Sequence, residues 1–381
     1  MTDPKKIVLL GATGSIGEST LQVIRKHPGH LQLIGVSAHS NSQKLADISN
    51  EFKVPHAYLP ETAPEVSDWP SHCTLDRSTD GLTDIAALEE ADVIVVAIVG
   101  ASGLGPTLSA LQAGKDIVLA NKESLVLGGD LVMRTAKANG ARVIPADSEH
   151  NAVFQCIQGE KHRDLDSIIL TASGGPFREL PFEKLKNVTI EQALNHPNWS
   201  MGNKVTIDSA TMANKGLELI EARWLFDLPP TKLEVVIHPT SIVHAMVRFI
   251  DGCCMAQLSP PSMTFALQHA LLFPDRAEGV HPSLDFSKPL DLNFSPPSFD
   301  KFPCLRLAKD SLEQGESAPL VFNAANEIAV SAFLSNRIGF LQISDIIEQT
   351  LSKFAHQSQN DLQALLSLDY EARRIAGEII E

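Results

Sequence analysis

The chain has 381 residues, 44% of them hydrophobic, and a formal net charge of −15 at pH 7. This length exceeds one ordinary hydrophobic core, so we expect two or three domains. The acidic balance argues against a broad nucleic-acid or membrane surface, and confines phosphate binding to small sites rich in lysine, serine and backbone amides. Five cysteines without a CxxC pair, no signal-peptide core and no membrane-length apolar run predict a cytoplasmic protein.

The first predicted element is a buried strand over residues 7–10, followed at once by the turn GATGSIG at 11–17 and a helix. Strand, glycine turn and helix start form the context in which backbone amides bind a pyrophosphate. Gly11 permits the turn, Gly14 allows close approach of the ligand, and Gly17 lets the helix pack near the strand. The spacing is GxxGxxG rather than GxGxxG, but the context favours dinucleotide binding over a tight turn without a ligand.

The second strand, over 31–36, ends in His39, Ser40 and Asn41. An enzyme that uses NAD commonly carries an acid there, so its absence favours NADP. Further strands over 57–59, 92–99, 116–120 and 142–146 alternate with helical segments, which predicts a parallel, doubly wound, Rossmann-like sheet. Lys122 follows one of these strands and is a candidate for proton transfer or for binding a substrate oxygen. The alternative is an ordinary surface lysine.

Acidic side chains follow the strand over 142–146. If the chain stays extended, Asp147 and Glu149 point to the same side. Two carboxylates with the Ser148 hydroxyl between them suit a hard divalent cation. The alternative is a polar turn with solvated acids.

A helix predicted over 209–224 supplies a third carboxylate. Its apolar residues at 213, 217, 220 and 224 form one stripe, while Asn214, Lys215 and Glu218 share another face. An amide, an ammonium and a carboxylate beside serine and threonine hydroxyls can bind a phosphate next to a metal ligand. With Asp147 and Glu149, the helix predicts an all-oxygen Mg²⁺ or Mn²⁺ site. A solvated Lys–Glu pair is the alternative.

Two loops in the middle of the chain have ligand-binding character. Ser173 and the two glycines after it follow a strand over 167–171 and suit an anion. The segment 196–202 carries Trp199 and Met201 without regular period, which is typical of a lid, or alternatively of a small satellite core. Short strands at 235–237, 242–250 and 253–258 predict a small antiparallel sheet, with His238 and His244 as structural or site-edge residues.

The predicted fold class is α/β, with four consecutive parts. Residues 1–147 form an NADPH-binding Rossmann-like domain, and residues 148–274 form an α+β catalytic and connective domain with a small sheet. Residues 275–302 are a proline-rich linker, and residues 303–381 form a helical bundle with a structural role.

These stretches together resemble the 1-deoxy-D-xylulose 5-phosphate reductoisomerase family over essentially the whole chain. The resemblance rests on long motifs in matching order and spacing: GATGSIG (11–17), LANKESLV (119–126), PADSEHNAVFQ (145–155), SGGPFRE (173–179), HPNWSMG (196–202) and DSATMANKGLELIEARWLF (208–226). It implies isomerisation and NADPH-dependent reduction of 1-deoxy-D-xylulose 5-phosphate to 2-C-methyl-D-erythritol 4-phosphate, in isoprenoid precursor synthesis by the non-mevalonate route. It also implies a homodimer with a sugar-phosphate substrate and no nucleic-acid or membrane partner.

The resemblance further implies roles for individual residues. The divalent metal (Mg²⁺, Mn²⁺ or Co²⁺) is held by Asp147, Glu149 and Glu218. The residues expected to act in catalysis are Lys122, Glu149 and His196. The residues expected to contact the substrate are these three together with Ser148, Ser173, Ser209, Asn214, Lys215 and Glu218. The residues expected to contact NADPH are Thr13, Gly14, Ser15, Ile16, His39, Ser40, Asn41, Asn121, Glu123 and Gly202. Trp199 and Met201 lie on the closing loop.

Two other classes of protein remain open at this point. One is an NADP-dependent dehydrogenase of another small phosphorylated or semialdehyde metabolite, which has no need of three metal carboxylates. The other is a non-catalytic NADP-binding sensor, which keeps the glycine turn but has no need of Asp147, Glu149 and Glu218 together.

Overall fold

The structure is a computed structural model that describes residues 3–199, 201–359 and 361–381. These residues form two compact units, each assembled from separate stretches of chain. The first unit comprises Met1–Ser124, Val132–Asn151 and Ser262–Ser283, and the second comprises Leu125–Leu131, Ala152–Pro261 and Leu284–Glu381. The predicted four-part division follows chain order instead, and it remains a proposal about how functions are distributed along the chain.

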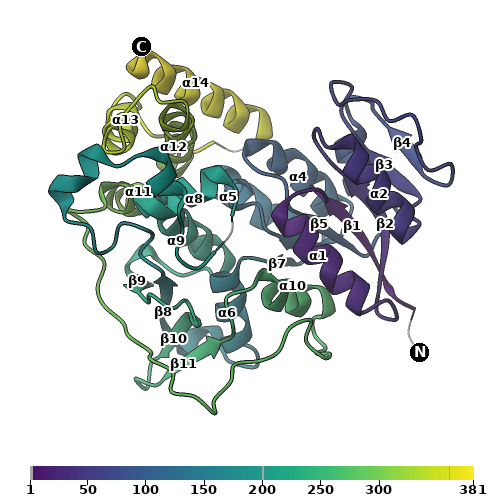
Figure 1. Ribbon diagram of the computed structural model, residues 1–381, viewed down its shortest axis with the longest axis horizontal. Helices are drawn as coiled ribbons and strands as arrows, with labels where there is room; N and C mark the ends of the chain where they lie inside the picture. The colour runs from purple at the N-terminus through teal and green to yellow at the C-terminus, as the bar shows by residue number, and fades with distance from the viewer. Residues whose placement is uncertain (1–2, 200, 360) are drawn as a thin grey trace. The chain divides into compact units, whose positions relative to one another are not determined.

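The first unit contains a parallel sheet with the order β4-β3-β2-β1-β5-β6-β7 (Figure 1). Its strands are β1 (Lys5–Leu10), β2 (Leu31–Ser37), β3 (His56–Tyr58), β4 (Thr74–Asp76), β5 (Val93–Val96), β6 (Asp116–Leu119) and β7 (Val143–Pro145). The strand order reverses between β1 and β5, which is where a doubly wound sheet opens a crevice for ligands. The predicted Rossmann-like sheet is confirmed. Strand β4 was not predicted, because three half-exposed residues carry almost no periodic signal.

Helices α1 (Ser15–Lys26), α2 (Ser42–Phe52), α3 (Gly81–Ala86) and α4 (Leu104–Gln112) connect the strands of this sheet. Helix α5 (Lys122–Ala138) follows β6 and has a kink at Gly128. A later helix, α10 (Met263–Leu272), also belongs to this unit and packs against α1 and β6. Lys5 anchors the end of α10, because its Nζ donates to the carbonyl of Phe273 at 2.6 Å. No sequence pattern predicted this return of the chain to the first unit.

The second unit contains a four-stranded sheet with the order β11-β10-β8-β9. Its strands are β8 (Leu165–Ala172), β9 (Leu233–Ile237), β10 (Val243–Phe249) and β11 (Cys254–Leu258). Strand β10 pairs antiparallel with β11, as predicted, and also antiparallel with β8, which was not predicted, but β9 pairs parallel with β8. The prediction of an antiparallel β9 was therefore wrong. The physical reason is the long helical connection between β8 and β9, because such a crossover returns the chain in the same direction.

That connection contains the helix predicted over 209–224, and the prediction of one continuous helix was wrong. The structure has α7 (Ile190–Leu194), then α8 (Asn203–Thr211) and α9 (Ala213–Leu225), with Met212 between the last two in a left-handed conformation at φ 64°. Ala213, Leu217 and Ile220 are buried as predicted.

The C-terminal segment is helical, as predicted, and is drawn in yellow-green to yellow in Figure 1. Its helices are α11 (Pro303–Gln314), α12 (Ala318–Leu334), α13 (Gln342–Leu351) and α14 (Leu362–Ile380). Pro303 and Pro319 lie in the first turns of α11 and α12, where a missing backbone N–H costs nothing. Within the second unit, α11 packs against α9, and both α11 and α12 pack against α8. The predicted linker over 275–302 has no helix among its residues, all of which are described, and it joins the sheet through a bridge from Ser295 to Ile237.

Candidate active site

The glycine turn of the first unit has the geometry of a pyrophosphate-binding loop. Gly11 has φ 86°, and a Cβ there would lie 2.5 Å from the carbonyl oxygen of Ala97. A Cβ on Gly17 would lie 2.4 Å from the carbonyl oxygen of Ala12, so only glycine allows α1 to approach the turn. No side chain caps α1 at Gly14, which leaves the first-turn amides beside Thr13, Ser15 and Ile16 for a ligand.

The end of β2 lies beside this turn. His39 and Ser40 are exposed, and the side chain of Asn41 caps α2 by accepting a hydrogen bond from the Lys44 amide at 3.2 Å. The ammonium of Lys44 lies 3.3 Å from the carbonyl oxygen of Thr13 and 3.4 Å from the Glu18 carboxylate. Lys44 is a cation at the glycine turn that no sequence motif predicted. Its position three residues after the helix cap was the available signal, since that spacing places it on the first turn of α2.

The end of β6 is organised by Asn121, which is buried. Its side-chain oxygen caps α5 by accepting from the Ser124 amide at 2.9 Å. Its amide group donates to the carbonyls of Ile98 and Gly100 at 2.8 and 3.0 Å, and to the carboxylate of Glu123 at 3.0 Å. Asn121 and Glu123 therefore hold the loop after β5 against the start of α5, and so shape the edge of the sheet at which ligands bind.

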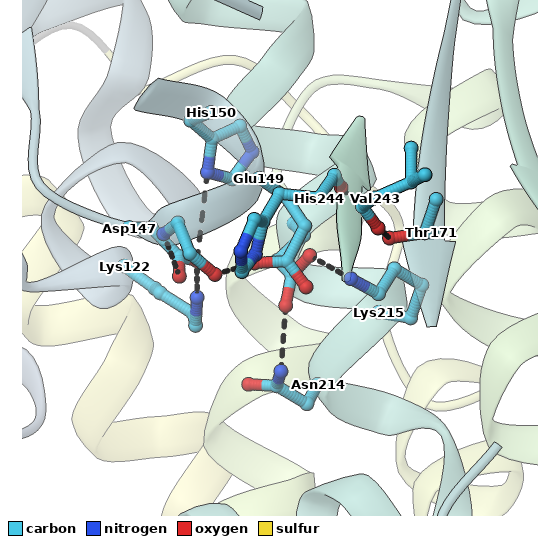
Figure 2. A network of polar contacts seen from close by, with 11 residues as sticks. Lys122, Asp147, Glu149, His150, Thr171, Asn214, Lys215, Val243 and His244 are labelled. Carbon is cyan, nitrogen blue, oxygen red and sulfur yellow. Dashed lines mark hydrogen bonds and ion pairs between the residues drawn. The ribbon is translucent and has the colours of Figure 1, made fainter. Parts of the chain in front are cut away.

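The end of β7 brings together Lys122, Asp147 and Glu149 (Figure 2). The expectation that the chain stays extended through Glu149 was wrong, because helix α6 (Ser148–Cys156) begins directly after Asp147. The first helical turn nevertheless keeps the two acids together, with carboxylate oxygens within 4.8 Å of each other. Lys122 forms an ion pair with Asp147, and the Ser148 hydroxyl donates to Glu149.

The acids of this cluster do not form a solvated turn, and Lys122 is not an ordinary surface lysine. The side chains of Lys122 and Asp147 are only 15% and 16% exposed. The buried imidazole of His150 also faces Asp147, with Nδ1 at 3.5 Å from the same carboxylate oxygen that pairs with Lys122. Two carboxylates this close repel each other at neutral pH, and an ammonium or a divalent cation relieves that repulsion. The donor set of two carboxylates and a hydroxyl fits a hard cation.

In the second unit, α9 presents the predicted polar face. The amide of Asn214 donates to Oε1 of Glu218 at 2.6 Å, and Lys215 forms an ion pair with the same carboxylate (Figure 2). The side chains of Lys215 and Glu218 are 5% and 1% exposed, which excludes the alternative of a solvated pair. A buried charged pair is costly unless further polar partners or ligands satisfy it, so this face has the character of a binding site.

A second polar cluster of this unit contains Ser173 and His196. The imidazole Nδ1 accepts the backbone N–H groups of Asn198 and Trp199 at 3.1 and 3.0 Å. The ring is therefore neutral and protonated at Nε2, which donates to Ser173 Oγ at 3.0 Å. The amide of Gly175 also donates to this oxygen, at 3.1 Å. With both donors directed at Oγ, the hydroxyl hydrogen of Ser173 is left to donate to a ligand such as a phosphate oxygen.

Ser209 lies next to this cluster. Gly175 has φ 66°, and a Cβ there would lie 2.6 Å from the carbonyl oxygen of Ser209. The glycine therefore lets the loop after β8 approach the backbone of α8 closely. Ser173, His196 and Ser209 come from three different elements, and the structure brings them into one region of the second unit, as expected for an anion site.

The predicted lid segment is tied to the small sheet. Trp199 packs edge-on against His244 with ring centroids 6.3 Å apart, and the Asn198 amide donates to the Pro239 carbonyl at 2.6 Å. Met201 is half-buried, and Gly202 precedes α8 as its N-cap. His244 and His238 are both buried, and His238 bonds Thr240 and the backbone of the 275–302 stretch, in keeping with a structural role.

The neutral state of His196 leads to a pH prediction. Burial lowers the pKa of His196 below its usual 6.5. As the pH falls below 6.5, the unfolded state takes up this proton before the folded state does. The contribution of the neutral imidazole to the free energy of unfolding is therefore fully present above pH 6.5, and it is lost as the pH falls from 6.5 toward the lowered pKa. We expect a His196→Asn variant to lose less stability than the parent between pH 7 and the lowered pKa, as measured by urea unfolding. An equal loss in the two proteins would contradict the neutral tautomer.

A glycine turn at the switch point of a doubly wound sheet, with a lysine and carboxylates at the ends of neighbouring strands, defines the class of dinucleotide-dependent α/β enzymes. Comparison with known families identifies the member of this class. The profile described as 1-deoxy-D-xylulose 5-phosphate reductoisomerase matches residues 7–129, and its C-terminal domain profile matches 143–226. The DXP reductoisomerase C-terminal domain matches residues 258–375.

Individual relatives agree over the whole chain. The 1-deoxy-D-xylulose 5-phosphate reductoisomerases of Clostridium perfringens and Trichlorobacter lovleyi are 45% and 48% identical, each over 98% of this chain and 99% and 97% of their own lengths. A DOX-P reductoisomerase solved with NADPH, fosmidomycin and magnesium is 42% identical, with a TM-score of 0.94 over 99% of this chain and 98% of that one. The Zymomonas mobilis enzyme, solved with NADPH, has a TM-score of 0.92 at 41% identity, over 99% of each chain.

The chain belongs to the 1-deoxy-D-xylulose 5-phosphate reductoisomerase family. It is therefore an enzyme, an NADPH-dependent reductoisomerase, and both the unrelated dehydrogenase and the non-catalytic sensor are excluded. The predicted fold class is confirmed, and the related structures solved with NADPH and with magnesium agree with the predicted cofactors. The roles of individual residues and the homodimer remain predictions. Among the helices of the described residues, none has the length and apolarity to cross a bilayer.

Proposed function

We propose that this protein, a homodimer in the cytoplasm, converts 1-deoxy-D-xylulose 5-phosphate to 2-C-methyl-D-erythritol 4-phosphate in isoprenoid precursor synthesis. The observation that carries this proposal is the family match along the whole chain. The two carboxylate clusters and the neutral Ser173–His196 pair support it, because they supply metal ligands and anion donors of the required chemistry.

The proposed metal ligands are the carboxylates of Asp147, Glu149 and Glu218. Once bound, a divalent cation supplies Lewis acidity to the substrate oxygens, and NADPH supplies the hydride. Lys122 sits at the Asp147 carboxylate, where its ammonium holds positive charge and can pass a proton to a substrate oxygen. Ser148 orients Glu149, the second candidate for moving a proton.

The substrate phosphate would be bound by hydroxyl, imidazole, amide and ammonium donors of the second unit: Ser173, His196, Ser209, Asn214 and Lys215. The fixed Nε2–H tautomer of His196 directs the hydrogen of Ser173 toward the phosphate. These donors lie on separate loops and helices of one unit, so phosphate binding positions the rest of the substrate. Closure of the segment with Trp199 and Met201 would exclude water.

NADPH would lie on the glycine turn, with its 2′-phosphate at the end of β2. The proposed contacts are Thr13, Gly14, Ser15, Ile16, His39, Ser40, Asn41, Asn121, Glu123 and Gly202. We add Lys44, whose ammonium already lies against the turn at Thr13. A lysine is suited to a phosphate as a mobile point charge, and Glu18 orients it through their ion pair.

Lys44 makes a testable contribution to the choice of coenzyme. We expect Lys44→Gln to raise the KM for NADPH by roughly tenfold, while the KM for NADH changes little, because only NADPH carries the 2′-phosphate. Steady-state rates with each coenzyme measure the effect. Lys53→Gln is a matched control at the end of the same helix, where the lysine contacts Asn50 instead. Equal effects on both coenzymes would rule out the proposed contact.

The proposed reaction is tested by oxidation of NADPH with 1-deoxy-D-xylulose 5-phosphate as the substrate. We expect turnover that EDTA abolishes and that added Mg²⁺, Mn²⁺ or Co²⁺ restores, with 2-C-methyl-D-erythritol 4-phosphate as the product identified by mass and NMR spectroscopy. The absence of turnover with metal present, or full turnover in EDTA, would refute it. Sedimentation equilibrium of the same protein tests the proposed homodimer.

A further inference from the structure

Helix α8 carries a buried carboxylate directly before Ser209. Asp208 is only 1% exposed, and its Oδ1 accepts a hydrogen bond of 2.8 Å from the side-chain amide of Asn326 on α12. Its Oδ2 lies 2.9 Å from the ammonium of Lys204, one helical turn earlier. The partners Asp208 and Asn326 are 118 residues apart in the chain, so this bond joins the C-terminal helices to the helix that carries Ser209.

Stability alone does not account for this pair. A buried carboxylate loses its hydration, and pairing it in the interior seldom improves on an apolar pair of the same volume. Asn326 is fully buried, and its side-chain oxygen has no hydrogen-bond partner within the described part of the chain. Apolar packing tolerates small shifts of a helix, whereas a hydrogen bond to a charged group does not. Such a bond can therefore fix the position of α8 even though it contributes little to stability.

The packing of the surrounding helices also joins the C-terminal helices to α8 and α9. Helix α8 packs against α11 and α12, and α9 packs against α11. A Cβ on Gly216 of α9 would lie 2.3 Å from Cβ of Ala308 on α11, so these two helices meet without room for a side chain. Burial, followed by the charge of Asp208, raises the pKa of the Cys304 thiol on α11 to about 12, which keeps that neighbour of the carboxylate neutral. The C-terminal helices thus form the support on which α8 and α9 rest.

We infer that Asp208 and Asn326 are positioning residues for the phosphate site, and that the C-terminal helices set the location of Ser209 through this bond. Residues 303–381 were predicted to have only a structural role. This inference gives them a role in substrate binding as well. The inference rests on the proposed function, because it takes Ser209 as part of the site that binds the phosphate of the substrate.

The test compares Asp208→Asn, Asn326→Asp and the double variant that exchanges the two residues, each in the full chain. We expect each single variant to raise the KM for 1-deoxy-D-xylulose 5-phosphate and the Kd for inorganic phosphate by about tenfold, with the KM for NADPH unchanged within about twofold. The exchanged pair keeps one carboxylate and one amide, so we expect it to recover both values to within about threefold of the parent. Asn326→Ser removes the amide without adding charge and replaces Asn326→Asp if that variant does not fold.

Asn323→Asp is the matched control, because Asn323 is a fully buried asparagine on the same helix that bonds Glu327 instead. It should lower the melting temperature but leave phosphate binding unchanged. Unchanged phosphate binding in the Asp208 and Asn326 variants would overturn the inference, as would a parallel rise in the KM values for substrate and NADPH that the exchange does not repair. Failure of the proposed function is separate, since it appears as absence of turnover in the parent while phosphate binding is still measured.

Discussion

Glu218→Gln should lower kcat/KM by roughly a thousandfold, because the variant loses a proposed metal ligand, and a metal ligand's charge contributes several kcal/mol to transition-state stabilisation. Glutamine has the same shape as glutamate, so it keeps the hydrogen bond from Asn214 and the packing of α9. What it loses is the negative charge that pairs with Lys215 and that we propose to bind the cation. The fall in activity should therefore accompany a weaker affinity for Mn²⁺, measured by calorimetry or by the paramagnetic signal of free Mn²⁺.

Glu234→Gln is the matched control for this variant. Glu234 lies on β9 of the same unit, its carboxylate accepts from Arg248 at 2.6 Å, and it is not one of the proposed metal ligands. We expect this variant to keep parental turnover and Mn²⁺ affinity. Parental Mn²⁺ affinity in Glu218→Gln would show that Glu218 is not a ligand, and would remove the third carboxylate from the proposed site.

Lys122→Met should lower kcat by roughly a hundredfold to a thousandfold, which is the range expected for loss of a positioned proton donor. Its effect on the metal should be opposite to that of Glu218→Gln. Lys122 forms an ion pair with Asp147, so its ammonium competes with a cation for the same carboxylate. We expect Mn²⁺ affinity in Lys122→Met to equal or exceed that of the parent, while turnover falls. The two variants together separate metal binding from proton transfer.

The control for Lys122→Met is Lys137→Met, which changes an exposed lysine in the last turn of the same helix, α5. It should keep parental kcat and Mn²⁺ affinity. A loss of Mn²⁺ affinity in Lys122→Met that matches the loss of turnover would assign Lys122 a role in building the metal site, and would exclude proton transfer as its main contribution.

The sequence determined features that depend on residues close together in the chain. Apolar runs followed by glycine or polar residues predicted the strands of the parallel sheet, because a buried strand and the turn after it are local properties. The turn at Gly11 followed for the same reason, since glycine readily adopts the positive φ of 86° that the turn requires. The motif around Asn214, Lys215 and Glu218 also lies within one helix, so its shared face was predictable from spacing alone.

Other features needed the tertiary structure, because they depend on which distant segments pack together. Nothing local predicts that α10 returns to the first unit, or that β9 runs parallel to β8. Met212 breaks a helix whose local pattern is continuous, because burial of its side chain offsets the cost of a left-handed backbone. Glu149 joins Asp147 through a helical turn rather than through an extended strand.

The same division applies to the polar groups of the site. The sequence identified the acidic and basic residues. Their burial distinguishes them from ordinary surface ion pairs, and that burial is a property of the tertiary packing. The spacing of Lys215 and Glu218 is that of any helical ion pair, and Lys122 and Asp147 are 25 residues apart. Only the packing of the surrounding elements removes these two pairs from water. The bond from Asn326 to Asp208 spans 118 residues, and no periodicity in a single sequence encodes a contact at that separation.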